Sequence, residues 1–338
     1  MNNYNSKISI LGVNPGHDAS FCGVDSKGTT QWIFEEERFN RIKHSNFITF
    51  DSLKIQIKDK LLNPLDVDLI AYCFEIEPNL VESLYNRCHN NIHSEFGQNI
   101  VDDLNNQYLI ENDAAFIIPL EELGQNQTSD KTSQKLHQLF PKAKIHGYNH
   151  HLSHAASTFF PSPFSESAVL IVDGAGLLET ATIWHCSGDT TKEVFRIELP
   201  HSLGIFYEVV SHALCLEEGK VMGLSSFGNP RFVSNLRKNV IDVDEKMGFR
   251  YLAPIISHGD IETTEYACQE LLRHIPIKRR SHSTDPISQE HADLAASAQQ
   301  ITEIILLSLV NRAKNLTGEK AICFAGGVMQ NSVAMGKI

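Results

Sequence analysis

The sequence predicts an α/β protein with two similar lobes, because one order of strands and helix occurs twice along its 338 residues. In the first half, three short apolar and β-branched runs lie between turns, at 8–13, 19–24 and 30–34. In the second half, runs of the same kind lie at 168–172, 180–184 and 193–199. A helical stretch follows each set, at 51–62 and at 203–216. This repeat indicates duplicated lobes, here residues 1–164 and 165–338, with a cleft between them.

Turn residues place the first hairpin of each predicted lobe. Asn14, Pro15 and Gly16 form the turn in the first lobe, and the Asp-Gly-Ala-Gly stretch at 173–176 is the matching turn in the second. Both turns are expected to point into the cleft. Further strands are expected at 67–74, 144–148 and 321–325. A long amphipathic helix is expected over 285–317, starting at an Asp-Pro pair.

The composition predicts a soluble, cytoplasmic globular protein, with 42% hydrophobic and 21% charged residues. No apolar run approaches the length of a membrane span, and the run at 8–13 is too short for a signal-peptide core. The net charge of −12 disfavours nucleic acid as the main ligand. Seven scattered cysteines without a C-x-x-C pair indicate reduced thiols rather than a cysteine metal cluster.

Two histidines on a predicted helix and an aspartate at a strand end form a candidate metal site. Asn149 can cap a helix that ends at Pro161. The apolar stripe of this helix is expected to comprise Leu152, Ala155, Ala156, Phe159 and Phe160. His150 and His154 lie one turn apart and roughly opposite that stripe, whereas His151 points elsewhere. With Asp173 after the run 168–172, the trio would leave coordination positions open and suit iron(II) or zinc better than magnesium. A solvated helix face that happens to hold histidines is the competing interpretation.

Seven separate stretches, in this order and spacing, resemble the NodU/CmcH carbamoyltransferase family. They are 16–20, 35–44, 150–157, 172–174, 202–204, 218–224 and 325–334. The resemblance covers the chain from about residue 8 to 338. The duplicated meander also resembles the superfamily of actin, hexokinase and the heat-shock ATPases (ASKHA), whose lobes are ribonuclease H-like. In that superfamily the first hairpins carry phosphate-binding turns.

The resemblance implies an O-carbamoyltransferase. Enzymes of the family make carbamoyl-adenylate from ATP and carbamoyl phosphate in a C-terminal YrdC-like domain. They then transfer the carbamoyl group to an acceptor hydroxyl in the metal-containing N-terminal domain. This chain matches the N-terminal domain only, so it is expected to be a fragment or to work with a separate YrdC-like polypeptide. The acceptor is expected to be a small-molecule hydroxyl, and aminoglycoside, cephem, oligosaccharide and polyketide acceptors all stay open.

Candidate catalytic residues lie near the first hairpin. His17 with Asp18 orienting it would serve as a general base for an acceptor hydroxyl, because the resemblance places them at the acceptor site. The alternative is that Asp18 caps the turn and His17 is structural. Lys43 would neutralise the negative charge of carbamoyl or phosphate oxygens. Surface solvation is the default interpretation for its neighbours Arg38 and Arg41.

Two glycine-containing segments are candidate nucleotide sites. Lys220, close to Gly223, could contact a nucleotide phosphate, although a buried ion pair with Glu217 or Glu218 is nearly as plausible. Gly326 and Gly327 follow a predicted strand and precede a predicted helix, so the backbone can approach a ligand there and the helix N-terminus can attract an anion. The superfamily binds adenosine at this position, where Asn331 could hydrogen-bond the nucleotide.

Two other functions stay open at this point. One is a relative of the tRNA threonylcarbamoyl-transferases, which share the fold and a similar histidine pair. The acidic charge and the residues around the histidine pair count against it. The other is a non-catalytic subunit that binds a nucleotide or a metal, which the missing C-terminal part favours.

Overall fold

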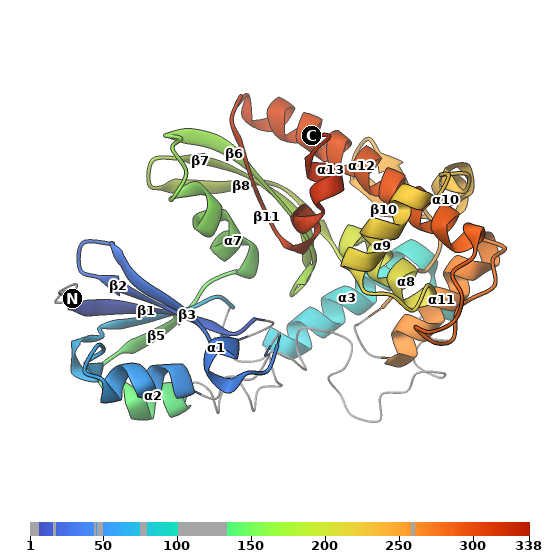
Figure 1. The fold of residues 1–338 in the computed structure, drawn as a ribbon. Coiled ribbons are helices and arrows are strands. Elements are labelled where there is room, and N and C mark those ends of the chain that lie inside the picture. The colour runs from blue at the N-terminus through green and yellow to red at the C-terminus, as the bar shows by residue number, and fades with distance from the viewer. Residues whose placement is uncertain are drawn as a thin grey trace. The chain divides into compact units, whose positions relative to one another are not determined.

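The structure is a computed structural model that describes residues 7–15, 18–43, 45, 50–74, 80–100, 134–257 and 261–338 (Figure 1). These residues form two compact units, which are considered separately. The first unit comprises Met1–Ser83 and Pro119–Ser153, and the second comprises Leu84–Ile118 and His154–Ile338. The division falls inside two helices, α3 (Leu80–Phe96) and α7 (His150–Phe159), rather than at the expected boundary 164/165.

The first unit contains a five-stranded sheet in the order β3-β2-β1-β4-β5. Its strands are β1 (Ile8–Asn14), β2 (Ser20–Asp25), β3 (Thr30–Glu35), β4 (Leu69–Tyr72) and β5 (Lys144–Gly147). Strands β1, β2 and β3 form the predicted antiparallel meander. Strand β4 lies parallel to β1, with Leu11 opposite Ile70, and β5 lies parallel to β4. All five strands predicted in this half are confirmed, although β4 is shorter than 67–74.

Helix α2 (Asp51–Lys58) ends earlier than the predicted 51–62. Lys60 has a left-handed φ of 59°, and the amides of Leu61 and Leu62 both donate to the carbonyl of Gln56. A left-handed residue with such bonds is a common helix C-terminus. The other helical elements here are α1 (Glu37–Asn40), η1 (Pro64–Asp66) and residues 134–139.

The second unit contains a four-stranded sheet in the order β11-β6-β7-β8. Its strands are β6 (Glu166–Gly176), β7 (Glu179–Ser187), β8 (Thr190–Glu198) and β11 (Ile322–Ala325). Strands β6, β7 and β8 form an antiparallel meander, and β11 lies parallel to β6. The strands β6, β7, β8 and β11 therefore have the same relative directions as β1, β2, β3 and β4, respectively, in the first sheet.

The turn predicted at 173–176 is wrong. Strand β6 continues to Gly176, which pairs with Glu179, and the register shifts between Val172 and Gly176. The reversal falls at the next two residues, where Leu177 has a φ of 79°. A bulged strand end thus replaces the turn, and such bulges redirect side chains at sheet ends.

Helices pack around the second sheet. They are α8 (Leu203–Ala213), α9 (Glu218–Leu224), α10 (Val233–Asn239), α11 (Ile261–His274) and α12 (Gln289–Thr317), with the 3-10 turn η2 (Ser225–Phe227). A small hairpin of β9 (Ile241–Asp244) and β10 (Gly248–Tyr251) also belongs to the unit. Helix α8 was predicted over 203–216 and is three residues shorter.

Helix α12 starts later than the predicted Asp-Pro pair at 285–286. Ser288 is its N-cap and forms a capping box with His291. Asp285 instead accepts hydrogen bonds from the amides of Ser281 and His282. Among the described residues α12 is also the one helix long and apolar enough to cross a membrane, contrary to the expectation that no run approaches that length. Because 72% of its apolar window is buried inside the protein, it also fits a core helix.

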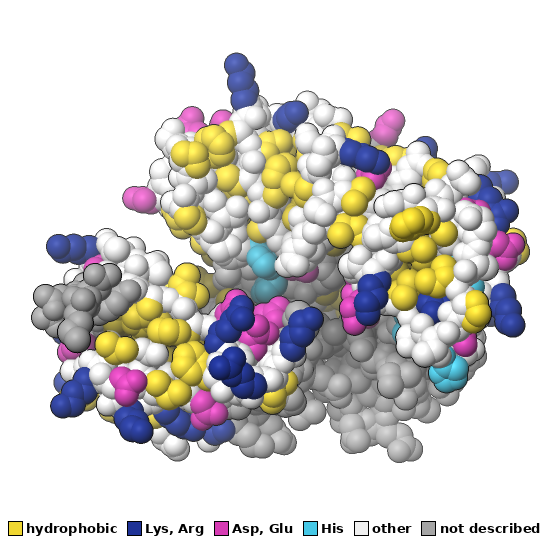
Figure 2. All heavy atoms as spheres, in the orientation of Figure 1, with side chains coloured by type: hydrophobic (Ala, Val, Ile, Leu, Met, Phe, Trp, Pro, Cys, Tyr) yellow, Lys and Arg dark blue, Asp and Glu magenta, His cyan; other side chains and the backbone are white. Residues whose placement is uncertain are grey.

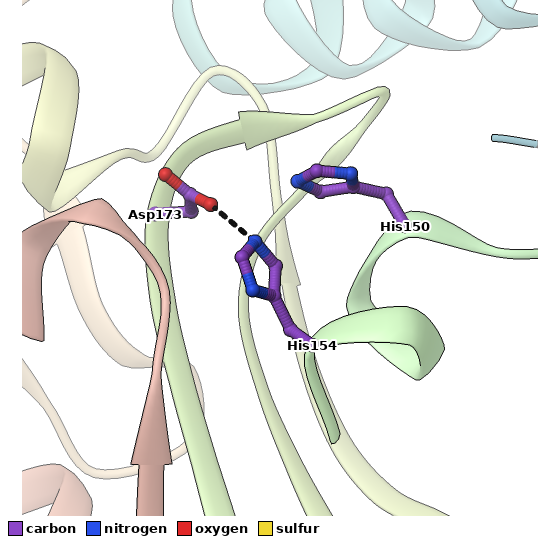
Figure 3. A group of neighbouring side chains, drawn as sticks. All are labelled: His150, His154 and Asp173. Atoms are coloured by element: carbon purple, nitrogen blue, oxygen red, sulfur yellow. Dashed lines mark ion pairs between the residues drawn. The ribbon is translucent and has the colours of Figure 1, made fainter. Parts of the chain in front are cut away.

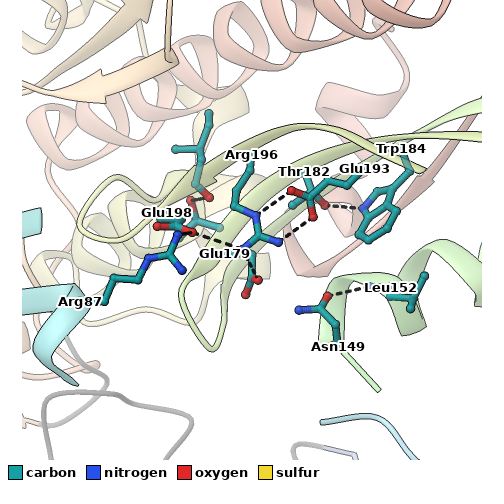
Figure 4. Close-up of polar contacts among 11 residues, drawn as sticks. Arg87, Asn149, Leu152, Glu179, Thr182, Trp184, Glu193, Arg196 and Glu198 are labelled. Atoms are coloured by element: carbon teal, nitrogen blue, oxygen red, sulfur yellow. Dashed lines mark hydrogen bonds and ion pairs between the residues drawn. The ribbon is translucent and has the colours of Figure 1, made fainter. Parts of the chain in front are cut away.

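An ion-pair network joins helix α3 to the meander of the second sheet (Figure 4). Arg196 contacts Glu179, Glu193 and Glu198, at 2.8, 2.7 and 3.3 Å respectively. Arg87 of α3 reaches Glu198 at 2.6 Å. These carboxylates raise the pKa of the Arg196 guanidinium, and the main cause is the hydrogen bond that Arg196 donates to Glu193. Figure 2 shows Lys and Arg side chains interspersed with Asp and Glu on the visible face.

Candidate metal centre

Helix α7 positions both histidines of the predicted site. The side-chain oxygen of Asn149 accepts the amide hydrogen of Leu152 at 3.0 Å, which confirms the predicted cap. Thr158 anchors the other end, donating to the carbonyl of Phe324 in β11 at 3.2 Å. The helix ends at Phe159, shortly before Pro161 as predicted.

The buried stripe of α7 differs in part from the prediction. His151, Ala155 and Phe159 are buried, with exposures of 0%, 0% and 3%. Phe160, expected in the stripe, is 55% exposed because the helix has already ended. His150 and His154 lie off this stripe and are half-buried. They are thus accessible to a ligand while the opposite side of the helix is fixed in the core.

Asp173 lies at the bulged end of β6 and faces His154 (Figure 3). Its Oδ2 is 3.2 Å from Nε2 of His154. Its Oδ1 accepts backbone amides from Gly174 at 2.8 Å and Gly327 at 3.2 Å. The His154 and Asp173 side chains keep 29% and 20% of their surface exposed. One carboxylate oxygen is therefore held by the backbone, and the other points at the imidazole.

His150 completes the group from one turn earlier in the helix (Figure 3). Its ring stacks on Phe74, with ring centroids 4.7 Å apart and planes 8° apart. One donor atom from each of His150, His154 and Asp173 lies within 4.8 Å of the other two. The sequence thus correctly predicted that these three side chains come together.

The donor set fits a transition-metal ion. Imidazole and carboxylate bonds to zinc are about 2.0–2.2 Å long, so two donors on one ion lie about 3–3.5 Å apart at tetrahedral angles. The 3.2 Å between His154 and Asp173 falls in that range. A donor atom of His150 lies within 4.8 Å of those of His154 and Asp173. Two nitrogen donors with one oxygen donor favour iron(II) or zinc over magnesium or calcium.

The N-terminus of α8 supports the backbone around Asp173. Ser202 caps α8 by accepting the amide of Ile205, and its hydroxyl donates to the carbonyl of Gly174 at 2.6 Å. A Cβ atom at Gly204 would lie 2.7 Å from the Gly174 backbone, so only glycine permits this approach. The role of these residues was not predicted, although a serine directly before a helical stretch is a recognisable cap signal.

The residues predicted around the first hairpin are only partly described. His17 lies outside the described residues. Asp18 is exposed, has a φ of 58°, and its carbonyl accepts from the side chain of Asn14 at 3.3 Å. Lys43 is exposed in a turn that follows α1. Their roles at an acceptor site stay predictions.

Lys220 and Gly223 lie on helix α9. Lys220 pairs with Glu217 at 3.2 Å, and both side chains are mostly exposed, so the ion pair expected as the alternative is present but not buried. Lys220 also lines a cavity of about 820 Å³ whose wall includes Glu208 and His212 of α8. Met222, next to Gly223, contacts Ser332 at 3.7 Å, which brings the two predicted nucleotide segments together.

The glycine pair after β11 has a structural cause. Gly326 has a φ of 95°, and a Cβ there would lie 2.3 Å from the carbonyl oxygen of Val172. The helix expected next is only a 3-10 turn, η3 (Gly327–Gln330), followed by the four-residue α13 (Ser332–Met335). Anion binding at this point stays a prediction, and the helical segments that follow the glycine pair are only four residues long each.

Asn331 is held by protein groups. Its amide nitrogen donates to Gln299 at 2.8 Å, its oxygen accepts from Gln299 at 3.0 Å, and that oxygen also caps α13 through the amide of Ala334. Gln299 is 4% exposed, so this amide pair is buried on its α12 side. The sequence did not identify Gln299 as a partner of Asn331, because a residue in a long amphipathic helix is expected to contribute to core packing.

Fold and site together define an α/β protein with a two-histidine, one-aspartate group suited to a metal ion. The family profile described as "Carbamoyltransferase N-terminus" matches residues 9–338, and the chain belongs to this family. The predicted resemblance is thus confirmed. All seven cysteines are free, as predicted, and four of them are buried.

Curated relatives agree with this membership. The chain is 28% identical over 307 residues to nodulation protein NolNO of Sinorhizobium fredii, covering 90% of this chain and 39% of that protein. It is 36% identical over 194 residues to the uncharacterized protein sll1178 of Synechocystis, covering 56% of this chain and 31% of that protein. It therefore spans about a third of these relatives. Among solved structures, the crystal structure of T. kodakarensis HypF matches 98% of this chain and 43% of its own, with 13% identity and a TM-score of 0.44.

Proposed function

We propose that this chain is the carbamoyl-transfer domain of an O-carbamoyltransferase. It would move a carbamoyl group from carbamoyl-adenylate, made from carbamoyl phosphate and ATP, to a hydroxyl of a small-molecule acceptor. The observation that carries the proposal is the convergence of His150, His154 and Asp173 in a chain of this family. Because the relatives are about twice as long as this chain, the activated donor would come from a further YrdC-like domain or polypeptide.

The trio would hold iron(II) or zinc. Such an ion, when bound, supplies a Lewis acid with open positions for phosphate oxygens of the donor. The protein's part is positioning, since α7 fixes both imidazoles and the Gly174 and Gly327 amides fix one oxygen of Asp173. Preorganised ligands of this kind lower the ordering cost of binding.

His17 would act as the general base for the acceptor. The acceptor hydroxyl oxygen attacks the carbamoyl carbon, its proton passes to His17, and the carbon–oxygen bond to the phosphate breaks, releasing AMP. Asp18 would orient His17, and Lys43 would offset the negative charge that develops on the carbamoyl oxygen. Loss of a positioned general base typically costs roughly two to four orders of magnitude in rate.

The adenylate would lie against the segments that carry Lys220, Gly223, Gly326, Gly327 and Asn331. The contact between Met222 and Ser332 supports this, because it joins the two segments within one unit. The repeated strand directions of the two sheets support the further proposal of duplicated ribonuclease H-like lobes of ASKHA type, divided near residue 164.

Metal content and carbamoyl transfer test the proposal together. Three proteins are loaded anaerobically with iron(II) or with zinc: wild type, His154→Ala and the control His137→Ala, which alters an exposed histidine outside the trio. Wild type and the control should retain about one ion per chain, and His154→Ala should retain far less. Equal metal content in all three would overturn the metal assignment.

Transfer is then measured with supplied carbamoyl-adenylate and a panel of hydroxyl acceptors. We expect no product from ATP and carbamoyl phosphate with this chain alone. Product is expected when carbamoyl-adenylate or a separate adenylate-forming domain is added, and it should fall with His154→Ala. Robust transfer by the chain alone from ATP and carbamoyl phosphate would refute the division of labour.

A further inference from the structure

The backbone amide of Gly327 points at the candidate metal ligand Asp173. It donates to Oδ1 at 3.2 Å, and the amide of Gly174 donates to the same oxygen at 2.8 Å. The other oxygen, Oδ2, faces His154 Nε2 at 3.2 Å. The two oxygens of one carboxylate thus have separate partners, with backbone donors on one side and the metal-binding side chain on the other.

The position of Gly327 explains why this amide is available. Gly327 is the first residue of η3, where an amide has no partner within the helical turn. Gly326 before it takes a φ of 95° and approaches the Val172 carbonyl so closely that a Cβ would lie 2.3 Å away. This close approach places the first residue of η3 next to Asp173, which follows Val172 in the chain. The glycine pair therefore directs a backbone amide at Asp173. This contact accounts for a glycine pair at 326–327 without the nucleotide-binding role that was predicted for Gly327.

We propose that Gly327 is a positioning residue for the metal, fixing Asp173 as a ligand that binds through Oδ2 alone. The inference rests on the proposed metal site. Two amide donors on Oδ1 oppose rotation of the carboxylate into a two-oxygen binding mode, and they hold Oδ2 toward His154. Hydrogen bonds to charged groups are among the stronger ones in proteins. Groups that orient metal ligands typically contribute 10–100-fold to metal affinity.

A matched pair of variants separates the amide from the added side chain. Gly327 has no left-handed φ, so other residues fit its backbone. Gly327→Ala keeps the donor and adds a Cβ 3.1 Å from Asp173 Oδ1, a tight contact that a small shift relieves. Gly327→Pro removes the donor and places its Cδ atom where the amide hydrogen was, against Asp173 Oδ1, at a first helical position where proline is tolerated.

Cobalt(II) is the probe, because its visible absorption reports both affinity and coordination. We expect Gly327→Pro to bind cobalt about 10–100-fold more weakly than Gly327→Ala. Its absorption should also weaken, as a freed carboxylate adds a second oxygen to the ion and raises the coordination number. The steric effect of the added Cβ is common to both variants, and the effect of the proline Cδ on Asp173 is separated from loss of the donor by the wild-type exchange measurement below. Equal affinities and spectra for the two variants would overturn the proposal.

Wild type provides an independent measurement if the proline variant does not fold. Glycine-selective ¹⁵N labelling follows the Gly327 amide, assigned by its loss in Gly327→Ala. We expect this amide to be protected from exchange without metal and its resonance to shift on zinc addition. An unprotected amide that does not respond to zinc would overturn the inference. Failure of wild type to bind cobalt or zinc would instead remove the metal site itself, so the two failures are distinguishable.

Discussion

Acidification should destabilise the second unit through His201. This side chain is buried, its Nδ1 accepts the amide of Tyr251 at 3.1 Å, and burial lowers its pKa to about 4. Arg250 lowers this pKa further and Asp244 opposes the shift, while Glu95 lies 3.8 Å from Nε2. Burial removes the imidazole from water without supplying a close partner for a second proton, so the folded protein favours the neutral form.

The sign and size of the effect follow from linkage. An unfolded histidine has a pKa near 6.5, so between pH 6.5 and 4 the unfolded chain binds more protons than the folded one. Stability is therefore complete above pH 6.5 and is lost as the pH falls toward 4. Between pH 7 and 5 the contribution of His201 amounts to about 2 kcal/mol.

Urea unfolding at pH 7 and pH 5 measures this contribution. Trp184 lies in β7 of the second unit, and a Trp32→Phe background leaves it as the single reporter there. His201→Asn can still accept the Tyr251 amide but does not titrate, so its stability should fall by about 2 kcal/mol less than that of the parent between the two pH values. The same fall in both proteins would refute the assignment to His201.

Three other substitutions test separate parts of the structure. Gly326→Ala should destabilise the protein by roughly 2–4 kcal/mol, because its Cβ would lie 2.3 Å from the carbonyl oxygen of Val172. The control Gly219→Ala, whose Cβ would have open space around it, should leave stability unchanged. Thermal unfolding of the two variants compares these effects. Tyr251→Phe removes the donor to the Ser202 carbonyl, 2.5 Å away, and should cost about 1–3 kcal/mol in urea unfolding; no loss would show that the bond is dispensable. Asp173→Asn should abolish tight zinc binding in calorimetric titration while leaving the fold unchanged by circular dichroism, and unchanged affinity would exclude Asp173 as a ligand.

Strand positions and the histidine helix were predictable from the sequence because local patterns decide them. Runs of β-branched residues bounded by turn residues gave the two meanders, and Asn149 with Pro161 bounded α7 correctly. The failures arose where tertiary pairing overrides local signals. The Asp-Gly-Ala-Gly stretch reads as a turn, yet its last glycine pairs with Glu179 and extends β6.

Other parts of the site depend on contacts between segments distant in sequence. A pair of glycines after a strand suggests a ligand site. Here, however, Gly326 packs against the backbone of Val172, which is 154 positions away in the chain. The hydrogen bond from Gly327 to Asp173 spans the same number of positions. The pairing of Asn331 with Gln299 similarly crosses 32 positions. Such contacts follow from the sheet order, which a single sequence does not reveal.

The burial of β6 has a consequence for how the protein would respond to a metal. Leu170, Ile171 and Val172 are fully buried, and Asp173 follows them directly. Fraying of this strand is opposed from both sides, because β6 pairs with β11 and with β7, and such inner strands open with the most stable part of a fold. Bound metal would therefore slow hydrogen exchange across the entire sheet β11-β6-β7-β8, and not only at the loops that surround the ion.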